Sequence, residues 1–374
     1  MTSARRRRLE GVREAMSVAG VDALLLSLGA DLPWLTGYEA MPLERLTMLV
    51  VPAAEPATLL VPRLEAPRVE PDPDVFEVRP WAEGDDPVAI VAGLVKLAAP
   101  TGSPYRLAIS DRTWATFVLA LQDALPQAEW SPSSRITAPL RAVKDPVEVE
   151  ALSAASAAAD RVAAQLLNGD IALVGRSERE VSQDIGRRLI AEGHQKVNFA
   201  IVGSGPNSAS PHHEAGRRVI QADEPVVCDF GGTMDGYCSD ITRTVWTGDA
   251  EPPAEFRDLY EVLRGAQQRG VEAATVGATC EAVDKVPRDL ITAGGYGEAF
   301  IHRTGHGIGL EEHEDPYIAA GNEIPLQPGH AFSIEPGIYL SGRFGARIED
   351  IVVATEAGPR ALNAVSHELT VVDA

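Results

Sequence analysis

Five residues with metal-binding side chains lie in the last two-fifths of the chain, each within a glycine-rich or strand-like segment: Asp229, Asp240, His306, Glu335 and Glu349. Four carboxylates and one imidazole can hold two divalent cations side by side. A water molecule that bridges such a pair becomes a hydroxide-like nucleophile near neutral pH. Hydrolysis is therefore the first hypothesis for the function.

The first two aspartates belong to a predicted β-hairpin with strands at residues 226–230 and 237–242. Residues 231–236 between them have the composition of a turn. If the turn is formed by residues 234–235, Asp229 and Asp240 face each other directly, with Cβ atoms roughly 5 Å apart. If residues 235–236 form it, the two carboxylates are diagonal neighbours, and either register could serve a metal pair.

The two glutamates belong to a second predicted hairpin, with strands at residues 332–335 and 346–353. Counting outward from Gly342 places Glu335 opposite Glu349. Like charges that face each other across strands repel, so two such pairs among apolar residues favour a bound cation. The alternative is that these carboxylates are solvated on edge strands or paired with Arg243 and Arg347.

The segment around His306 contains three histidines within twelve residues, His302, His306 and His313. The spacing of His302 and His306 would suit a zinc site on a helix. Gly305, Gly307 and Gly309 argue against a helix, because glycine is a poor helix former. We therefore predict a loop or a strand that brings imidazoles close to exposed backbone.

Taken together, these segments resemble the signature of the pita-bread metallopeptidases, at residues 229–240, 304–309, 335–339 and 347–350. Within that group the chain is similar to the prolidase and aminopeptidase P branch, which cleaves bonds before proline, and particularly to the short bacterial Xaa-Pro dipeptidases. The resemblance extends over almost the whole chain and includes an amino-terminal creatinase-like domain.

The resemblance implies a role for each of the five ligands. Asp229 would bind the first metal, Asp240 and Glu349 would bridge both metals, and His306 and Glu335 would bind the second. Glu335 would also accept the proton of the bridging water. The hard oxygen donors favour two Mn²⁺ ions, with Co²⁺ or Zn²⁺ as alternatives.

The resemblance also implies catalytic residues that do not anchor the metals, the histidines His212, His302 and His313. Imidazoles suit the stabilisation of an oxyanion and the protonation of a leaving nitrogen. We add Arg347, which lies two residues before Glu349 on the same strand face and would hold that carboxylate or bind the carboxylate of a substrate. Tyr339 would donate a hydrogen bond within the site or pack as an ordinary strand residue.

The order of apolar runs and helical patterns predicts two domains. Residues 1–140 alternate between strands and helices, as in a small α/β domain. Residues 141–374 read as an α+β domain with largely antiparallel strands, and the resemblance identifies it as the pita-bread catalytic domain. The predicted helices begin near residues 5, 86, 113, 146, 178, 254 and 279, and the predicted strands near residues 23, 48, 58, 106 and 196.

Composition limits the partners and the location. The chain has 374 residues and a formal net charge of −21, and it lacks the basic face that nucleic acid binding requires. Arg5 to Arg8 are followed by charged residues rather than an apolar stretch, so we predict no signal peptide. No apolar segment has membrane-spanning length. We therefore predict a cytoplasmic protein without disulfides, and the resemblance implies a homodimer.

Three classes of function follow. The first is a two-metal peptidase that acts on a proline-containing dipeptide or short peptide, as an Xaa-Pro dipeptidase or as an aminopeptidase P. A dipeptidase needs a cation for the free carboxylate of proline, and Arg303 and Arg347 are the candidates near the motifs. The second is a creatinase-like hydrolase or lyase that acts on another small molecule. The third, a metal-free binding module, conflicts with five intact ligands.

Overall fold

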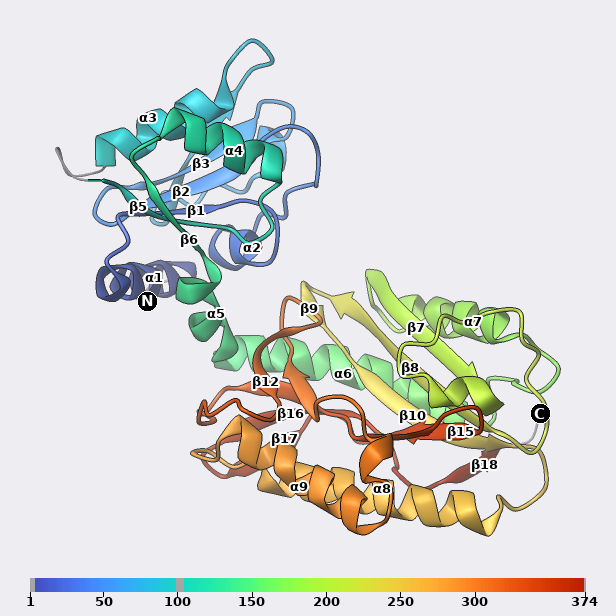
Figure 1. Cartoon of the computed structure of the whole chain (residues 1–374). Coiled ribbons are helices and arrows are strands. Elements are labelled where there is room, and N and C mark those ends of the chain that lie inside the picture. The colour runs from blue at the N-terminus through green and yellow to red at the C-terminus, as the bar shows by residue number, and fades with distance from the viewer. Residues whose placement is uncertain (1–3, 99–103, 373–374) are drawn as a thin grey trace. The chain divides into compact units, whose positions relative to one another are not determined.

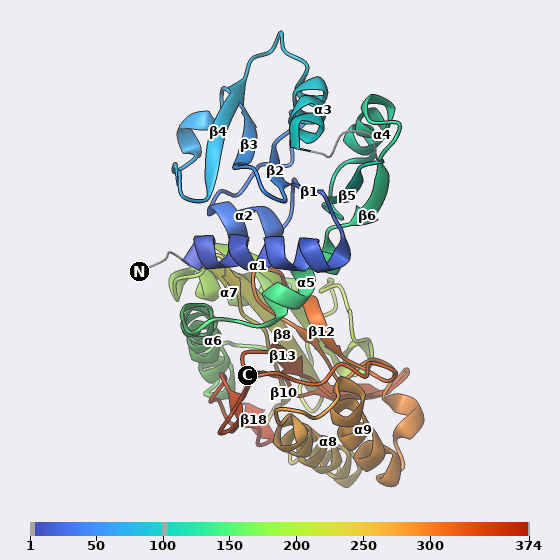
Figure 2. The same ribbon diagram turned by 90° about the vertical axis from the view of Figure 1, so that its left-hand side faces the viewer.

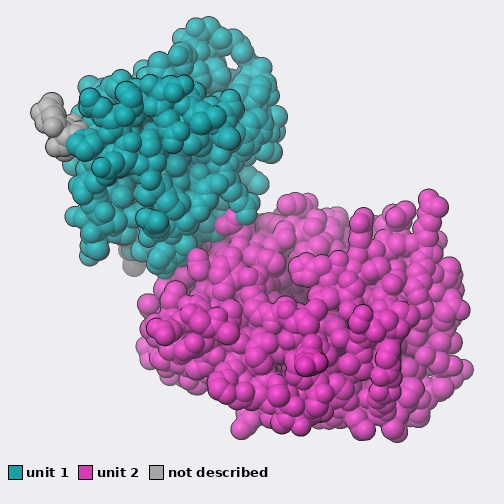
Figure 3. Space-filling view, in the orientation of Figure 1, with its two compact units in different colours: residues 1–141 teal, residues 142–374 magenta. Residues whose placement is uncertain are grey.

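A computed structural model describes residues 4–98 and 104–372 of the chain. The chain divides into two compact units, residues 1–141 and 142–374, which are coloured separately in Figure 3. The domain boundary predicted from the sequence lies after residue 140, one residue before this division. Among the described residues, no helix combines the length and the apolar character needed to cross a membrane.

Unit 1 is built on a mixed six-stranded sheet with the strand order β4-β3-β2-β1-β5-β6. The strand β2 is antiparallel to both of its neighbours, β1 and β3, whereas β4, β5 and β6 each pair in parallel with the neighbour on their inner side. The four strands predicted from apolar runs are confirmed. The edge strands β4 and β6 were missed because they carry few buried apolar residues. The six strands are β1 (Ala23–Leu26), β2 (Met48–Pro52), β3 (Ala57–Pro62), β4 (Phe76–Trp81), β5 (Arg106–Ile109) and β6 (Glu129–Pro132).

Helices α3 and α4 cover one face of this sheet, as Figure 1 shows. Their buried residues Val91, Val95 and Leu121 pack against Leu25 and Leu107 of the central strands. The helices predicted near residues 5–18, 86–98 and 113–124 are confirmed. The helices of this unit are α1 (Ala4–Ala19), α2 (Asp31–Thr36), α3 (Pro87–Ala98), α4 (Ala115–Ala124), α5 (Ser134–Ala142) and the short 3-10 helix η1 (Ala66–Arg68).

The first half of unit 2 packs two helices, α6 and α7, on a mainly antiparallel sheet. Both helices begin where predicted, and each begins with a capping box. In the first, the Asp145 side chain accepts from the amide of Glu148 at 3.0 Å, and the Glu148 side chain accepts in return from the Asp145 amide at 2.9 Å. The elements are α6 (Pro146–Leu167), α7 (Glu178–Ala191), β7 (Lys196–Ser204), η2 (Gly205–Ala209), β8 (Pro225–Met234), β9 (Tyr237–Cys238), β10 (Ile241–Thr247) and β18 (Thr370–Val372).

The second half of unit 2 has the same plan. Helices α8 and α9 lie side by side in Figures 1 and 2 and cover a second antiparallel sheet with the order β12-β11-β13-β16-β17. The ribbon formed by β14 and β15 packs against α8. The elements are α8 (Ala254–Ala273), α9 (Cys280–Ala293), η3 (Gly297–Ala299), β11 (Gly305–Gly307), β12 (Glu314–Ile318), β13 (Ala331–Ile334), β14 (Gly337–Leu340), β15 (Phe344–Arg347), β16 (Asp350–Thr355) and β17 (Gly358–Ala361).

The two halves meet where the predicted ligand hairpins come together. An isolated antiparallel bridge joins Thr242 of β10 to Glu349, and the Glu349 amide donates to the Thr242 carbonyl at 3.2 Å. The prediction of an α/β amino-terminal domain followed by an α+β domain is confirmed. The bridge between Thr242 and Glu349 holds the two ligand hairpins next to each other.

Candidate metal centre

The first hairpin turns at Asp235 and Gly236. Both residues have a positive φ, 49° and 85°, which is the backbone of a tight type I′ turn. Met234 pairs with Tyr237, and Asp229 pairs with Thr242. Of the two registers considered, the diagonal one is therefore correct and direct opposition of the aspartates is wrong. The consequence is that Thr242, two residues after Asp240, stands opposite Asp229.

The second hairpin has the predicted register. Gly337 pairs with Arg347 in the β14–β15 ribbon, and Ile334 pairs with Asp350 between β13 and β16. The two pairs have the same register, and Glu335 and Glu349 lie between them along the chain. That register places Glu335 opposite Glu349.

Three of the predicted ligands lie where a strand is interrupted. Asp240 stands between β9 and β10, Glu335 between β13 and β14, and Glu349 between β15 and β16. At these positions the side chain is released from the regular alternation of a pleated strand. The breaks therefore allow the carboxylates to turn towards one another.

His306 is the central residue of the short strand β11, which pairs with β12 and β13. A Cβ atom at Gly305 or Gly307 would collide with the backbone oxygen of Ser333 or Asp315, so only glycine permits this packing. The Nδ1 atom of His306 lies 3.1 Å from the carbonyl oxygen of Gly307. A proton on Nδ1 donates a hydrogen bond to this oxygen. Its Nε2 atom is thereby left to face the carboxylates.

The nitrogen Nε2 of His306 lies 3.3 Å from Glu335 and 3.7 Å from Asp240. One ligand atom each from Asp240, His306 and Glu349 falls within a span of 4.8 Å. Burial lowers the pKa of His306 to about 3, so the imidazole is neutral and its lone pair can bind a cation.

Three of the four predicted carboxylate ligands each have one buried oxygen that no hydrogen bond satisfies among the described residues. They are Asp229 Oδ1, Asp240 Oδ1 and Glu349 Oε1. Burial and the neighbouring carboxylates raise the pKa of Asp240 and Glu349 well above the usual range, and burial raises the pKa of Glu335 to about 7. Unsatisfied buried oxygens are costly, and divalent cations would satisfy them. The donor set therefore fits a metal centre.

Arg347 is almost completely buried and links the cluster to its surroundings. Its Nη2 atom lies 2.6 Å from Asp229, its Nε atom donates to Thr242 at 3.1 Å, and its Nη1 atom donates to the Tyr339 hydroxyl at 2.7 Å. The carboxylate that it holds is thus Asp229, and the expectation that it holds Glu349 directly is wrong. The Thr242 hydroxyl instead donates to Glu349 at 2.7 Å.

His302 has partners at both ring nitrogens. Nδ1 lies 2.7 Å from the Arg303 carbonyl and Nε2 lies 2.9 Å from the Tyr339 hydroxyl. Burial lowers its pKa to about 4, so the neutral ring donates to Arg303 and accepts from Tyr339. The hydrogen bond predicted for Tyr339 is therefore present, and it ties His302 to Arg347.

His313 and His212 are more exposed and lie near the same space. The His313 ring packs against His306 with 3.9 Å between centroids, and Arg303 Nη2 lies 3.5 Å from its Nδ1 atom. Burial, Arg303 and His212 all lower the pKa of His313. The charge of His212 also contributes to the lowered pKa of His302. His212 thus lies close enough to affect both of the other predicted catalytic histidines.

Two hydroxyl residues of the site were not predicted, Thr242 and Ser333. Ser333 accepts from the amide of His306 at 3.0 Å and donates to Glu335 at 3.1 Å. Thr242 lies two residues after Asp240, and Ser333 lies two residues before Glu335. A search for polar residues at this same-face spacing would have found both.

The cysteines lie outside the cluster. Cys228 points away from it into the core under α6 and α7, and burial raises the pKa of its thiol to about 12. Cys238 and Cys280 are also buried, and all three are free thiols. None of them is placed as a metal ligand or nucleophile.

An amino-terminal α/β unit followed by two helix-covered sheets around an acidic, imidazole-containing centre defines a metal-dependent hydrolase. Residues 150–356 match the metallopeptidase family M24, and residues 8–143 match the creatinase/prolidase amino-terminal domain. The chain belongs to the M24 metallopeptidases and carries both domains.

Known relatives match over nearly their full lengths. The probable dipeptidase PepE of Mycobacterium tuberculosis is 43% identical over 98% of this chain and 96% of its own. The Xaa-Pro dipeptidase of Lactobacillus helveticus is 35% identical over 97% of this chain and 98% of its own. The crystal structure of a prolidase from Thermococcus sibiricus superimposes with a TM-score of 0.92 at 35% identity and covers 100% of both chains.

Proposed function

We propose that this metallopeptidase is a dinuclear Xaa-Pro dipeptidase. The observation that carries the proposal is the convergence of buried, unsatisfied carboxylates with a neutral imidazole, in a chain similar throughout its length to proteins named as Xaa-Pro dipeptidases. The substrate is then a dipeptide whose second residue is proline.

The proposed ligands are Asp229, Asp240, His306, Glu335 and Glu349, with Asp240 and Glu349 shared between two Mn²⁺ ions. When bound, the two ions supply a hydroxide-like nucleophile and polarise the scissile carbonyl. Oxygen-rich donor sets with a single imidazole suit Mn²⁺, and Co²⁺ or Zn²⁺ are alternatives.

Protein side chains accept and donate the protons that the reaction transfers. Glu335 accepts the proton of the attacking water, and the hydrogen bond from Ser333 orients its carboxylate. His212 and His313 face the substrate, where they stabilise the oxyanion and deliver a proton to the leaving proline nitrogen. His302 acts through Tyr339, because both of its own nitrogens already have partners.

Arg303 is the proposed cation for the free carboxylate of the dipeptide. Arg347 is occupied by Asp229, Thr242 and Tyr339. Arg303 forms no ion pair with a carboxylate among the described residues, and its guanidinium lies over the Tyr317 ring at 4.4 Å, with His313 at 3.5 Å. A cation beside the catalytic histidines favours a substrate that ends at proline.

An assay of the Mn²⁺-supplemented protein tests the proposal. An Xaa-Pro dipeptide is compared with an Xaa-Pro-Yaa tripeptide, and Asp240→Ala is the inactive control. Cleavage of the dipeptide alone is the expected result. Cleavage of the longer peptide would favour an aminopeptidase P, and inertness towards both would favour a creatinase-like hydrolase of another small molecule.

The proposal extends to the setting of the enzyme. The acidic composition supports a cytoplasmic enzyme, and the resemblance to the prolidase branch implies a homodimer. Sedimentation of the purified protein tests the assembly. A mass near twice 39.8 kDa is expected, and a mass near 39.8 kDa would contradict the dimer.

A further inference from the structure

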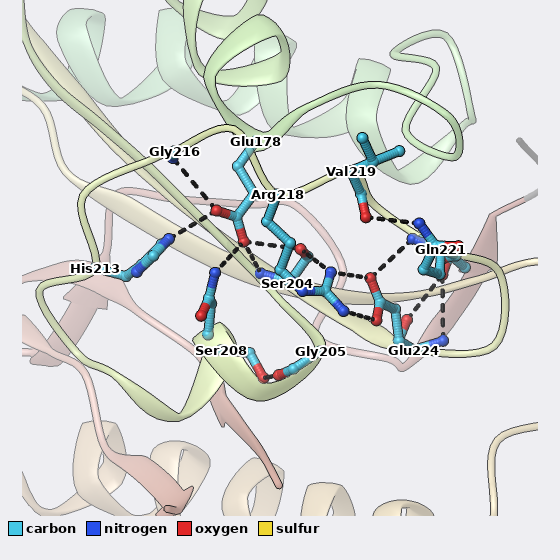
Figure 4. A network of polar contacts seen from close by, with 12 residues as sticks. Glu178, Ser204, Gly205, Ser208, His213, Gly216, Arg218, Val219, Gln221 and Glu224 are labelled. Atoms are coloured by element: carbon cyan, nitrogen blue, oxygen red, sulfur yellow. Dashed lines mark hydrogen bonds and ion pairs between the residues drawn. The ribbon is translucent and has the colours of Figure 1, made fainter. Parts of the chain in front are cut away.

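Glu178, the first residue of α7, is a completely buried carboxylate outside the metal cluster. It accepts five hydrogen bonds from one segment of the chain, as Figure 4 shows in part. The donors are the Ser204 amide at 2.9 Å, the Ser204 hydroxyl at 2.8 Å, the Asn207 side chain at 2.9 Å, His213 Nε2 at 2.8 Å and the Gly216 amide at 3.3 Å. One carboxylate thereby fixes both ends of residues 205–216, which we name the His212 loop.

The opposite side of the His212 loop is held by the second ligand hairpin. The Ser208 hydroxyl accepts from the Gly345 amide at 2.8 Å, and the Pro211 carbonyl accepts from Arg347 Nη1 at 3.2 Å. Arg347 is the residue that also holds Asp229. The loop is therefore fastened between Glu178 and the residues that surround the metal ligands.

His212 itself depends on these attachments. Its side chain is exposed and makes no hydrogen bond to a described residue, so its own contacts do not fix its position. The residue before it is held by Arg347, and the residue after it, His213, is held by Glu178. The backbone of His212, and with it the direction of its Cα–Cβ bond, is therefore set by these two attachments.

We propose that Glu178, with His213, is a positioning residue that aims His212 at the substrate. The proposal rests on the catalytic role given to His212 above. Although burial alone would raise the pKa of Glu178, hydrogen bonds from His213 and Ser204 hold that pKa below its usual value, so the group acts as a charged acceptor. A glutamine would present an amide nitrogen to some of these donors and would release part of the loop.

Hydrogen exchange measured by mass spectrometry tests the positioning without reference to activity. In Glu178→Gln, amides of residues 205–216 should exchange at least tenfold faster, whereas amides of residues 229–240 and 304–309 should be unchanged. The matched control is Glu180→Gln. Glu180 lies on the same first turn of α7 and is exposed, and its side chain forms hydrogen bonds only with Ser177 among the described residues. Unchanged exchange of the loop in Glu178→Gln would overturn the proposal.

A double-mutant cycle tests the functional consequence. Glu178→Gln should lower kcat about tenfold to hundredfold with little change in KM, since a general acid–base group contributes on the order of 10²–10⁴. In a His212→Ala background the same change should lower kcat no further. An equal loss in both backgrounds would show a general structural effect and overturn the proposal.

A second variant covers the case in which Glu178→Gln fails to fold. His213→Leu removes one donor from the surface side of the network, where the imidazole is 18% exposed. It should show the same dependence on His212, and independence of His212 would overturn the proposal. A wild-type protein that cleaves no Xaa-Pro peptide would count against the proposed function, and the exchange measurement would still test the positioning.

Discussion

Thr242 donates from its hydroxyl to a carboxylate oxygen of Glu349 at 2.7 Å, and this bond joins the first ligand hairpin to the second. The same hydroxyl accepts from Arg347 at 3.1 Å, so one side chain orients both a ligand and its guanidinium neighbour. The two carboxylate hairpins are therefore coupled by side chains as well as by the backbone bridge.

Thr242→Val should weaken metal binding. Valine keeps the shape of threonine but leaves an oxygen of Glu349 without its donor. Loss of a hydrogen bond to a metal ligand typically costs about 10–100-fold in metal affinity or activity. Mn²⁺ titration measures the change. Thr233→Val, which removes a hydroxyl bonded to Asn198 outside the centre, is the control and should keep wild-type affinity. Equal affinities for both variants would contradict this account of Thr242.

Arg347→Met should cost more stability without metal than with it. In the metal-free protein Arg347 is the buried cation beside Asp229, and removal of one partner of a buried ion pair costs about 3–5 kcal/mol. Bound Mn²⁺ would offset part of that loss. Urea unfolding with and without Mn²⁺ measures the difference, and Arg347→Lys, which keeps the charge but not the fork of donors, should fall between. Equal losses in both conditions would count against the prediction.

Removal of metal should lower the stability of the whole protein. Chelation leaves several carboxylates crowded in a buried space, and binding stabilises the folded state by about 2.7 kcal/mol for each site at one hundred times Kd. Calorimetry should show a lower Tm after dialysis against a chelator and recovery with Mn²⁺. Asp240→Asn should respond less. An identical Tm in both states would contradict the assignment of these carboxylates to a metal centre.

His330 should contribute to acid sensitivity. Burial, reinforced by Lys144, lowers its pKa to about 4, and the Gln327 amide donates to its Nδ1 atom, which requires an unprotonated nitrogen. The unfolded chain binds a proton near pH 6.5, so this stabilisation is present above pH 6.5 and is lost as the pH falls towards 4. Over that range His330→Gln should show a shallower loss of unfolding free energy than the wild type in urea. If the unfolding free energies of the two proteins fell in parallel with pH, the role given to His330 would be contradicted.

Much of the fold could be predicted from the sequence because its signals are local. The capping boxes at Asp145 and Ser177 use residues three positions apart, and both helices begin there. The second hairpin could be registered by counting from Gly342. For the first hairpin two registers stayed open, although Asp235-Gly236 is the more favourable sequence for a type I′ turn, and the positive φ of both residues shows that this turn forms.

The parts of the site that could not be predicted depend on contacts between segments far apart in the sequence. Arg347 shares a strand face with Glu349, so sequence spacing pointed to the wrong carboxylate, and the pairing with Asp229 spans 118 positions. Likewise, nothing near His213 in the sequence indicates that its partner is Glu178, 35 residues earlier. Local sequence patterns predicted the ligands, whereas the residues that orient them could be identified only from the tertiary structure.

Anomalous diffraction from crystals of the Mn²⁺-loaded protein tests the central claim most directly. Two manganese peaks are expected among Asp229, Asp240, His306, Glu335 and Glu349, with Asp240 and Glu349 reaching both. Data from Asp240→Ala should show one peak or none. An active, Mn²⁺-loaded wild-type protein whose manganese lies elsewhere, or is absent, would contradict the dinuclear centre.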